Sequence, residues 1–272
     1  MTSIFSYAFF QNALLGSLLA SLLCGLVGTY IVTRRLVFIS GGVTHASFGG
    51  IGIGVYLGIS PILSAAVFAV LSACGIQWFS HRRDMREDSA IAIFWTLGMS
   101  VGIICSFLAP GFTPELPSYL FGNILTVTPA DLWLLGILAA MAVAGFTVFL
   151  RPLVSVAFDA EFARSQRLPV TAIEYVMMAF IALTIVACLR MVGIVLVISL
   201  LTIPQVTANL FTRQFKHMAL LSVPIGYAGC LGGLYLSFRY NIPSGASIIF
   251  VSILIYLACK GISSWNIHRG RQ

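Results

Sequence analysis

Apolar runs, separated by short polar or charged segments, follow one another along the whole chain. A helix needs about 20 apolar residues to cross the roughly 30 Å hydrocarbon layer of a bilayer. Nine runs approach or reach that length, so the pattern predicts nine membrane-spanning helices, at residues 8–30, 36–58, 61–79, 89–109, 131–150, 172–189, 192–210, 218–238 and 245–260. Very short connections follow the second and sixth runs, so each should form a helical hairpin with the next run.

Glycines recur at every fourth position in three of the predicted helices. Small residues at this spacing allow helices to approach closely in lipid. We therefore expect tight packing along three stripes, Gly50/Gly54/Gly58, Gly98/Gly102 and Gly229/Gly233.

The composition excludes most classes of water-soluble protein. Hydrophobic residues make up 59% of the 272 residues, charged residues 8%, and the mean hydropathy is +1.01. Soluble domains are about 25% charged, so this chain has too few charges to cover a water-facing surface. A soluble enzyme, a disordered protein and a disulfide-stapled secreted domain are excluded. The chain is predicted to be an all-α polytopic membrane protein, with residues 1–272 forming one integral membrane domain.

The basic residues predict the orientation of the chain, whose formal net charge is +7. Arginine and lysine concentrate on the cytoplasmic side of membrane proteins. Arg190 and Arg239 fall on one side of the predicted spans, and the other thirteen basic residues fall on the opposite side. The N-terminus is therefore predicted outside and the C-terminus in the cytoplasm, and nucleic acid is not indicated as a partner. The amphipathic segment 117–127 is expected to lie on the outer surface or dip into the membrane.

Several kinds of chemistry have no support in the sequence. All eight acidic residues fall in loops or at span ends, whereas ion-coupled transporters usually keep carboxylates at membrane depth. Lys216 and Lys260 follow phenylalanine and cysteine, so neither fits a phosphate-binding loop of the GxxxxGK[ST] kind. The six cysteines lie in apolar stretches without CxxC spacing and are interpreted as buried apolar residues. If this protein moves a solute uphill, another chain must supply the energy.

His45 is the ionisable side chain that falls most clearly inside a predicted span. It lies ten residues after Arg35, which is about 15 Å along a helix and near the bilayer midplane. At this depth a polar side chain must face protein or water. Two interpretations remain open: a hydrogen bond to a neighbouring carbonyl, or transient ligation of a transition metal on a transport path. Thr44 and Ser47 are candidates for lining that path, and a symmetric dimer could bring two copies of His45 together.

A second candidate lies between the fifth and sixth spans, on the predicted cytoplasmic face. It combines charged and aromatic side chains at Phe158, Asp159, Glu161, Phe162 and Arg164. Asp159 is expected to cap a short helix, on which the two phenylalanines, four residues apart, would share a face. Such an apolar ridge either covers the protein's own membrane surface or fits a groove in a partner. The missing ATPase motif favours a partner. The other histidines, at positions 81, 217 and 268, are expected to be solvated loop residues.

Pro204 interrupts the seventh run and removes a backbone hydrogen bond from it. Thr202, Gln205 or Asn209 can compensate the freed carbonyls or line a cavity. The sequence leaves both a packing kink and a pathway-lining segment open, with Thr202 and Gln205 as candidate lining residues.

These residues resemble those of a known family, the integral membrane permeases of manganese, zinc and iron ABC importers. Six blocks, in the order of the family, carry the resemblance over nearly the whole chain. They are Gly28–Gly50 (GTYIVTRRLVFISGGVTHASFGG), Glu87–Gly102 (EDSAIAIFWTLGMSVG), Pro117–Thr128 (PSYLFGNILTVT), Phe158–Pro169 (FDAEFARSQRLP), Val192–Asn209 (VGIVLVISLLTIPQVTAN) and Pro243–Ala246 (PSGA).

The resemblance implies a homodimeric permease in the bacterial inner membrane, bound to two ATPase subunits and served by an extracytoplasmic metal-binding protein. It also implies that segment 158–164 docks onto the ATPase. Two positions depart from the family pattern: Gly41 stands where the family carries an aspartate four residues before His45, and Arg167 replaces a glycine near the end of the docking motif.

The sequence thus predicts a non-enzymatic permease subunit for zinc, manganese or iron, with ATP used by a partner and no permanently bound cofactor. His45 is the expected metal ligand. Two alternatives remain: a permease for a metal chelate of the siderophore or cobalamin type, and a stand-alone channel or secondary carrier.

Overall fold

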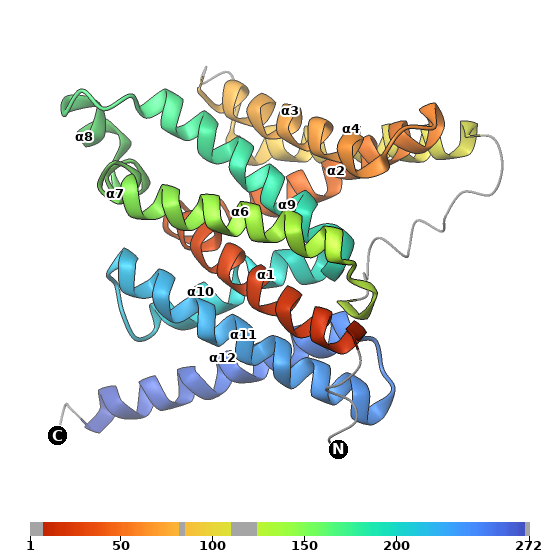
Figure 1. Cartoon of the computed structure of the whole chain (residues 1–272). Coiled ribbons are helices and arrows are strands. Elements are labelled where there is room, and N and C mark those ends of the chain that lie inside the picture. Colours follow the sequence, from red (N-terminus) through yellow and green to blue (C-terminus); the bar gives the residue numbers. More distant parts are fainter. Residues whose placement is uncertain (1–7, 82–84, 110–123, 270–272) are drawn as a thin grey trace. The chain divides into compact units, whose positions relative to one another are not determined.

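The computed structural model describes residues 8–81, 85–109 and 124–269, and within these ranges the regular structure is helical (Figure 1). The all-α prediction is therefore confirmed. The α-helices are α1 (Ala8–Thr33), α2 (Val37–Leu57), α3 (Pro61–His81), α4 (Glu87–Leu108), α6 (Pro129–Val148), α7 (Leu150–Phe158), α8 (Ala160–Ser165), α9 (Val170–Leu200), α10 (Ile203–Asn209), α11 (Phe215–Tyr240) and α12 (Ser244–Arg269). A short 3₁₀ turn, η1 (Ile124–Thr126), precedes α6. Of the predicted surface segment 117–127, residues 117–123 lie outside the described residues.

Eight helical segments in the described part of the chain are long and apolar enough to cross a membrane. They match eight of the nine predicted runs. The remaining run forms α2, a helix of 21 residues that includes six glycines. The number of spans and their orientation stay predictions.

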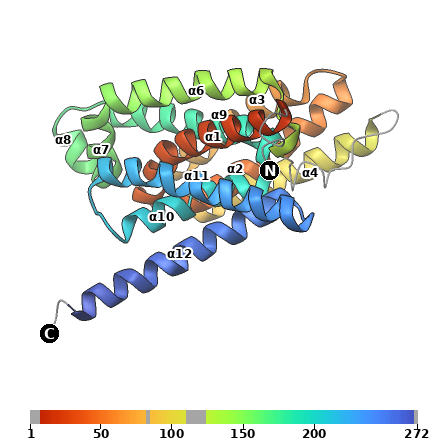
Figure 2. The same ribbon diagram turned by 60° about the horizontal axis from the view of Figure 1, so that its bottom comes forward.

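The chain divides into two compact units, and the prediction of a single domain remains a prediction. Unit 1 comprises Met1–Arg35, Leu120–Phe149 and Arg190–Gln272. In it, α1 packs between α6 and α11, while α10 and α12 both pack against α11 (Figures 1 and 2). Helix α6 begins with a capping box, in which the Thr128 hydroxyl accepts from the Asp131 N–H and the Asp131 carboxylate accepts from the Thr128 N–H.

Unit 2 comprises Leu36–Tyr119 and Leu150–Leu189. Its helix α2 packs against both α3 and α4, and glycines set these contacts. Gly50 and Gly54 face the α3 backbone near Ala65 and Pro61, which confirms the predicted α2–α3 hairpin and the packing role of these two residues. The expectation for Gly58 was wrong: no atom approaches its Cβ position, and it ends α2 with a left-handed φ of 68°. Glycine is the residue that adopts this conformation without steric cost.

The other two glycine stripes also lie at helix contacts. A Cβ on Gly98 or Gly102 would meet the α2 backbone at Ala46 or Phe48. A Cβ on Gly229 would meet Ser252 of α12, and one on Gly233 would meet Ile248. Small residues therefore permit close backbone approach in both units, as predicted.

The second predicted hairpin falls at α9, which continues from Val170 to Leu200 with non-helical backbone at Gly193 (φ 73°, ψ 167°). The helix is interrupted there, and the packing of its two halves against each other stays a prediction. A further break separates α9 from α10 at Leu201 and Thr202, and Pro204 is the second residue of the new helix.

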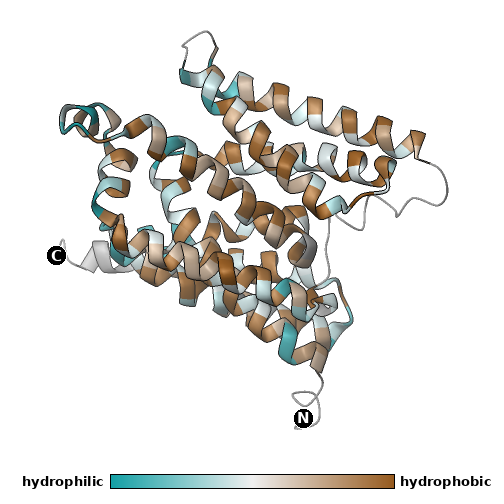
Figure 3. Cartoon of the chain, turned by 45° about the horizontal axis from the view of Figure 1, so that its top comes forward, coloured by the Kyte–Doolittle hydropathy of each residue, from teal (hydrophilic) through white to brown (hydrophobic). Residues whose placement is uncertain are grey.

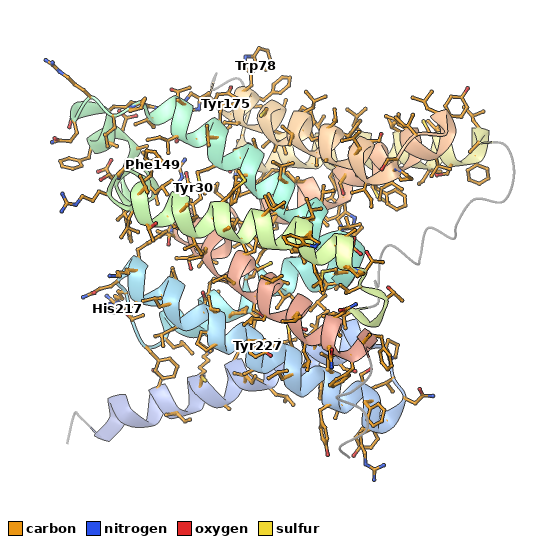
Figure 4. All side chains as sticks on the ribbon, viewed as in Figure 1. Tyr30, Trp78, Phe149, Tyr175, His217 and Tyr227 are labelled. Carbon is orange, nitrogen blue, oxygen red and sulfur yellow. The ribbon has the colours of Figure 1, made fainter. Side chains whose placement is uncertain are left out.

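Large apolar side chains stand on the outer faces of the helices. Phe107 is 86% exposed, Trp133 75% and Phe38 73%. Figure 3 shows apolar residues along the helices, with hydrophilic residues concentrated near their ends. Trp78, labelled in Figure 4, projects away from α3. Exposed apolar faces of this extent are expected where lipid replaces water as the solvent.

Candidate functional site

His45 lies on α2 and stacks on Trp95 of α4. The two ring centroids are 4.3 Å apart and the ring planes differ by 5°. The stack depends on the close approach of α2 and α4, because a Cβ on Gly98 would lie only 2.5 Å from the Cα of Ala46. Trp95 precedes Gly98 by about one helical turn, so the same backbone contact brings its indole over the imidazole.

The imidazole of His45 has a buried nitrogen that no described residue satisfies. Its Nδ1 is enclosed and has no hydrogen-bond partner among the described residues. The hydroxyls of Thr44 and Ser47 are fully buried and donate to the α2 carbonyls of Ser40 and Thr44. The interpretation of His45 as hydrogen-bonded through Nδ1 to a carbonyl therefore has no support here, and path lining by Thr44 and Ser47 stays a prediction.

No group of three or more histidine, cysteine, aspartate or glutamate side chains in the described ranges is arranged to hold a metal ion. A stable site for a transition metal generally takes several ligands. Within the described ranges His45 is therefore a candidate for a single nitrogen ligand, and a complete coordination shell would need water, further oxygen atoms or a second chain.

The docking candidate consists of the end of α7 and the short helix α8. Asp159 caps α8 as predicted, its carboxylate accepting from the N–H of Phe162 at 2.9 Å. Glu161 and Arg164 form an ion pair on the surface of α8. Phe158 and Phe162 are 63% and 56% exposed. The expectation that they share one helical face was wrong, because Asp159 has extended backbone (φ −149°, ψ 97°) and places Phe158 in α7 and Phe162 in α8.

Helix α8 is anchored beneath this exposed surface. Ala163 is fully buried and packs with Val156 of α7 and Val170 of α9. Two backbone hydrogen bonds end α8. The N–H of Leu168 donates to the carbonyl of Ala163, and the N–H of Arg167 donates to the carbonyl of Arg164. This is the Schellman arrangement, which favours glycine at the position of Arg167. Arg167 has a φ of 60°, in the left-handed region.

The structure shows contacts of a buried carboxylate, that of Glu174, which the sequence did not predict. Glu174, in the second turn of α9, is 3% exposed and accepts a hydrogen bond from Gln77 of α3 at 3.1 Å. His81, the last residue of α3, has its Nε2 3.5 Å from the same carboxylate and 3.5 Å from the Arg164 guanidinium. His81 is exposed, as expected, but it ends α3 and lies beside Glu174 instead of lying in a loop. A helix-end histidine and glutamate 93 positions apart give no signal of proximity in one sequence.

The break between α9 and α10 uses Gln205 as the sequence suggested. Pro204 lacks the N–H that would bond to the carbonyl of Leu200, and the Gln205 amide donates to that carbonyl instead, at 3.1 Å. The same amide donates to the carbonyl of Cys24 in α1 at 2.7 Å. Both bonds lie within unit 1, and they support the interpretation of Pro204 as a packing kink. A path-lining role for Thr202 and Gln205 stays a prediction.

The sequence profile of the ABC 3 transport family matches residues 6–262. The chain belongs to the ABC 3 transport family. The family resemblance inferred from the six sequence blocks is therefore confirmed, and the chain is a multi-pass membrane protein.

Several known proteins match this chain over most of its length. An uncharacterised membrane protein of Synechocystis sp. is 39% identical over 257 residues, covering 94% of this chain and 92% of its own. The manganese transport system membrane protein MntC of Halalkalibacterium halodurans is 33% identical and covers 92% and 86%. The solved structure of PsaBC from Streptococcus pneumoniae in complex with Fab superposes with a TM-score of 0.84 at 28% identity, covering 95% and 93%.

Proposed function

We propose that this chain is the permease subunit of an ATP-driven importer for a divalent transition metal ion, with manganese as the first candidate and zinc and iron as the others. Family membership and the similarity to the manganese transport protein MntC support the class of solute. The observation on which the proposal rests is at His45. This imidazole lies on a membrane helix, and its buried Nδ1 has no hydrogen-bond partner among the described residues.

The transport chemistry is ligand exchange without a covalent step. Neutral imidazole binds manganese, zinc and iron, and a conduit needs ligands that release the ion as readily as they take it. Gly41 contributes no carboxylate beside His45. We propose that a second copy of the chain supplies a second His45 and that water completes the shell, which keeps the site transient.

The energy for uphill transport comes from an ATPase subunit that docks on α8. The exposed side chains of Phe158 and Phe162 form the apolar contact, while Asp159 fixes the start of α8 and the pair of Glu161 and Arg164 orders its surface. The predicted orientation places this surface in the cytoplasm, where ATP is available. An extracytoplasmic metal-binding protein delivers the ion to the opposite face.

The metal is identified from the elemental content of cells that lack this gene and redundant importers, grown with limiting manganese, zinc and iron. A selective fall in manganese, restored by the intact gene but not by His45→Ala, is the expected result. No change in any of the three metals would refute the proposal. It would favour the chelate permease instead, which competition by metal chelates rather than free ions would then identify.

Docking is tested with Phe162→Ala in vesicles that contain the whole importer. The variant is expected to fold and to lose metal uptake while the ATPase continues to hydrolyse ATP, because the apolar contact between subunits is removed. Phe238→Ala is the matched control. Phe238 is as exposed as Phe158, at 63%, but it lies near the C-terminal end of α11 and outside the proposed docking surface. Normal transport by Phe162→Ala would refute docking at α8, and uptake without ATP would support the stand-alone carrier.

A further inference from the structure

We propose that Trp95 is a positioning residue for metal transfer, which holds the imidazole of His45 by face-to-face stacking so that Nε2 is presented to the ion. This inference rests on the proposed role of His45 as a ligand. It adds a residue that the sequence did not single out, on a different helix.

Metal-binding histidines are usually oriented by a hydrogen bond from the second ring nitrogen to a carboxylate or a carbonyl. The Nδ1 of His45 has no such partner among the residues that the structure describes. Gly41, one turn earlier on α2, has no side chain that could provide one. Another interaction must therefore fix the plane of the imidazole, whose terminal torsion is otherwise broad.

The indole of Trp95 supplies that interaction. With centroids 4.3 Å apart and planes within 5°, the two rings overlap face to face. Aromatic pairs of this kind change an equilibrium by about 2- to 10-fold beyond simple burial. Because Nδ1 is enclosed in this orientation, Nε2 is the nitrogen left to bind a metal. An imidazole that has donated to a metal is also poorer in electrons, so the electron-rich face of the indole favours the metal-bound form.

The position of Trp95 is itself fixed by the packing of α4 on α2. Gly49 faces Gly98, and Gly52 faces Gly102, so the two helices are in backbone contact just C-terminal to His45 and Trp95. Trp95 is 38% exposed, which leaves part of its indole uncovered. The imidazole of His45 is the aromatic ring that stacks on its indole.

Fluorescence tests the contact directly. The chain has four tryptophans, and replacing Trp78, Trp133 and Trp265 by phenylalanine leaves Trp95 as the one tryptophan in the full-length chain, reconstituted in lipid vesicles and excited where tyrosine does not absorb. Mn²⁺ is paramagnetic and quenches a fluorophore in contact with its ligand. We expect saturable quenching by Mn²⁺ that His45→Ala abolishes. Quenching that is absent, or that persists unchanged in His45→Ala, would overturn the inference.

Uptake by the whole importer tests the role. Trp95→Ala and Trp95→Leu should raise the KM for Mn²⁺ by about 2- to 10-fold, with little change in kcat, and Trp95→Phe should restore a low KM because it keeps a ring for stacking. Leu is included because it fills the space without a ring. Trp133→Ala is the control, since Trp133 is 75% exposed on α6 and should leave KM unchanged.

The two proposals fail in different ways. If His45→Ala transports Mn²⁺ normally, His45 is not the ligand and the proposed function of this site is wrong. If His45→Ala abolishes uptake while Trp95→Ala and Trp95→Leu behave like Trp133→Ala, the inference about Trp95 alone is wrong.

Discussion

Gly98 lies in the close contact between α2 and α4, and we expect its substitution by alanine to destabilise the protein. A Cβ added there would lie 2.5 Å from the Cα of Ala46 and 2.6 Å from its carbonyl oxygen. Carbon atoms in contact normally lie about 3.5–4.0 Å apart. Both opposing atoms belong to the backbone, so no side chain can rotate away. Gly98→Ala therefore forces α2 and α4 apart by about 1 Å.

The cost follows from this displacement. Overpacking of a well-packed contact costs about 1–3 kcal/mol, and the higher helix propensity of alanine returns up to about 1 kcal/mol. We expect a net loss of about 1–2 kcal/mol in the free energy of unfolding. For a chain of this size that loss lowers Tm by about 2–8 °C. Metal uptake should fall as well, because Gly98 holds the helix that carries Trp95.

The assay is thermal unfolding of the purified full-length chain in one detergent, with Gly145→Ala as the control. Gly145 lies inside α6, and no atom lies within 4 Å of its Cβ position. Alanine should be neutral or mildly stabilising there. An unchanged Tm for Gly98→Ala, or an equal loss in both variants, would show that backbone contact at Gly98 does not limit stability.

Three further substitutions test polar contacts and backbone strain with the same measurement. Gln205→Ala removes two hydrogen bonds to backbone carbonyls and should lower the free energy of unfolding by about 2–3 kcal/mol. Glu174→Ala leaves the buried amide of Gln77 without this acceptor and should cost about 1–3 kcal/mol. Arg167→Gly should raise stability by about 0.5–1 kcal/mol, because φ is 60° at this position.

Each of these has an outcome that contradicts it. Wild-type stability in Gln205→Ala would mean that the two hydrogen bonds of Gln205 contribute nothing net. The same result for Glu174→Ala would assign no stabilising role to the α3–α9 contact. Arg167→Ala is the control for the turn: it keeps a Cβ, so a gain equal to that of Arg167→Gly would rule out relief of backbone strain.

Much of the secondary structure follows from the sequence, because a bilayer imposes a length and a polarity on every span. All nine predicted runs are helical in the structure. Hydrogen bonds between residues close together in the chain could also be predicted. Asp159 caps α8, and Gln205 compensates the carbonyl that Pro204 leaves free.

Local geometry was missed where a single backbone torsion decides the outcome. The extended conformation of Asp159 separates Phe158 from Phe162 onto two helices, although their spacing alone suggested one face. Gly58 continues a four-residue repeat in the sequence but lies past the end of α2. Spacing cannot reveal where a helix stops when the glycine that ends it also fits the stripe.

By itself, the sequence determined the helical class, the approximate spans, the family and His45 as the candidate ligand. Only the tertiary structure decided which residues meet: Trp95 with His45, and Gln77 and His81 with Glu174. The physical reason is the solvent. In lipid the outer face of a helix is as apolar as the buried face, so hydrophobic periodicity no longer marks the side that packs. Contacts between helices then depend on where small residues let backbones approach, which appears only when both helices are in place.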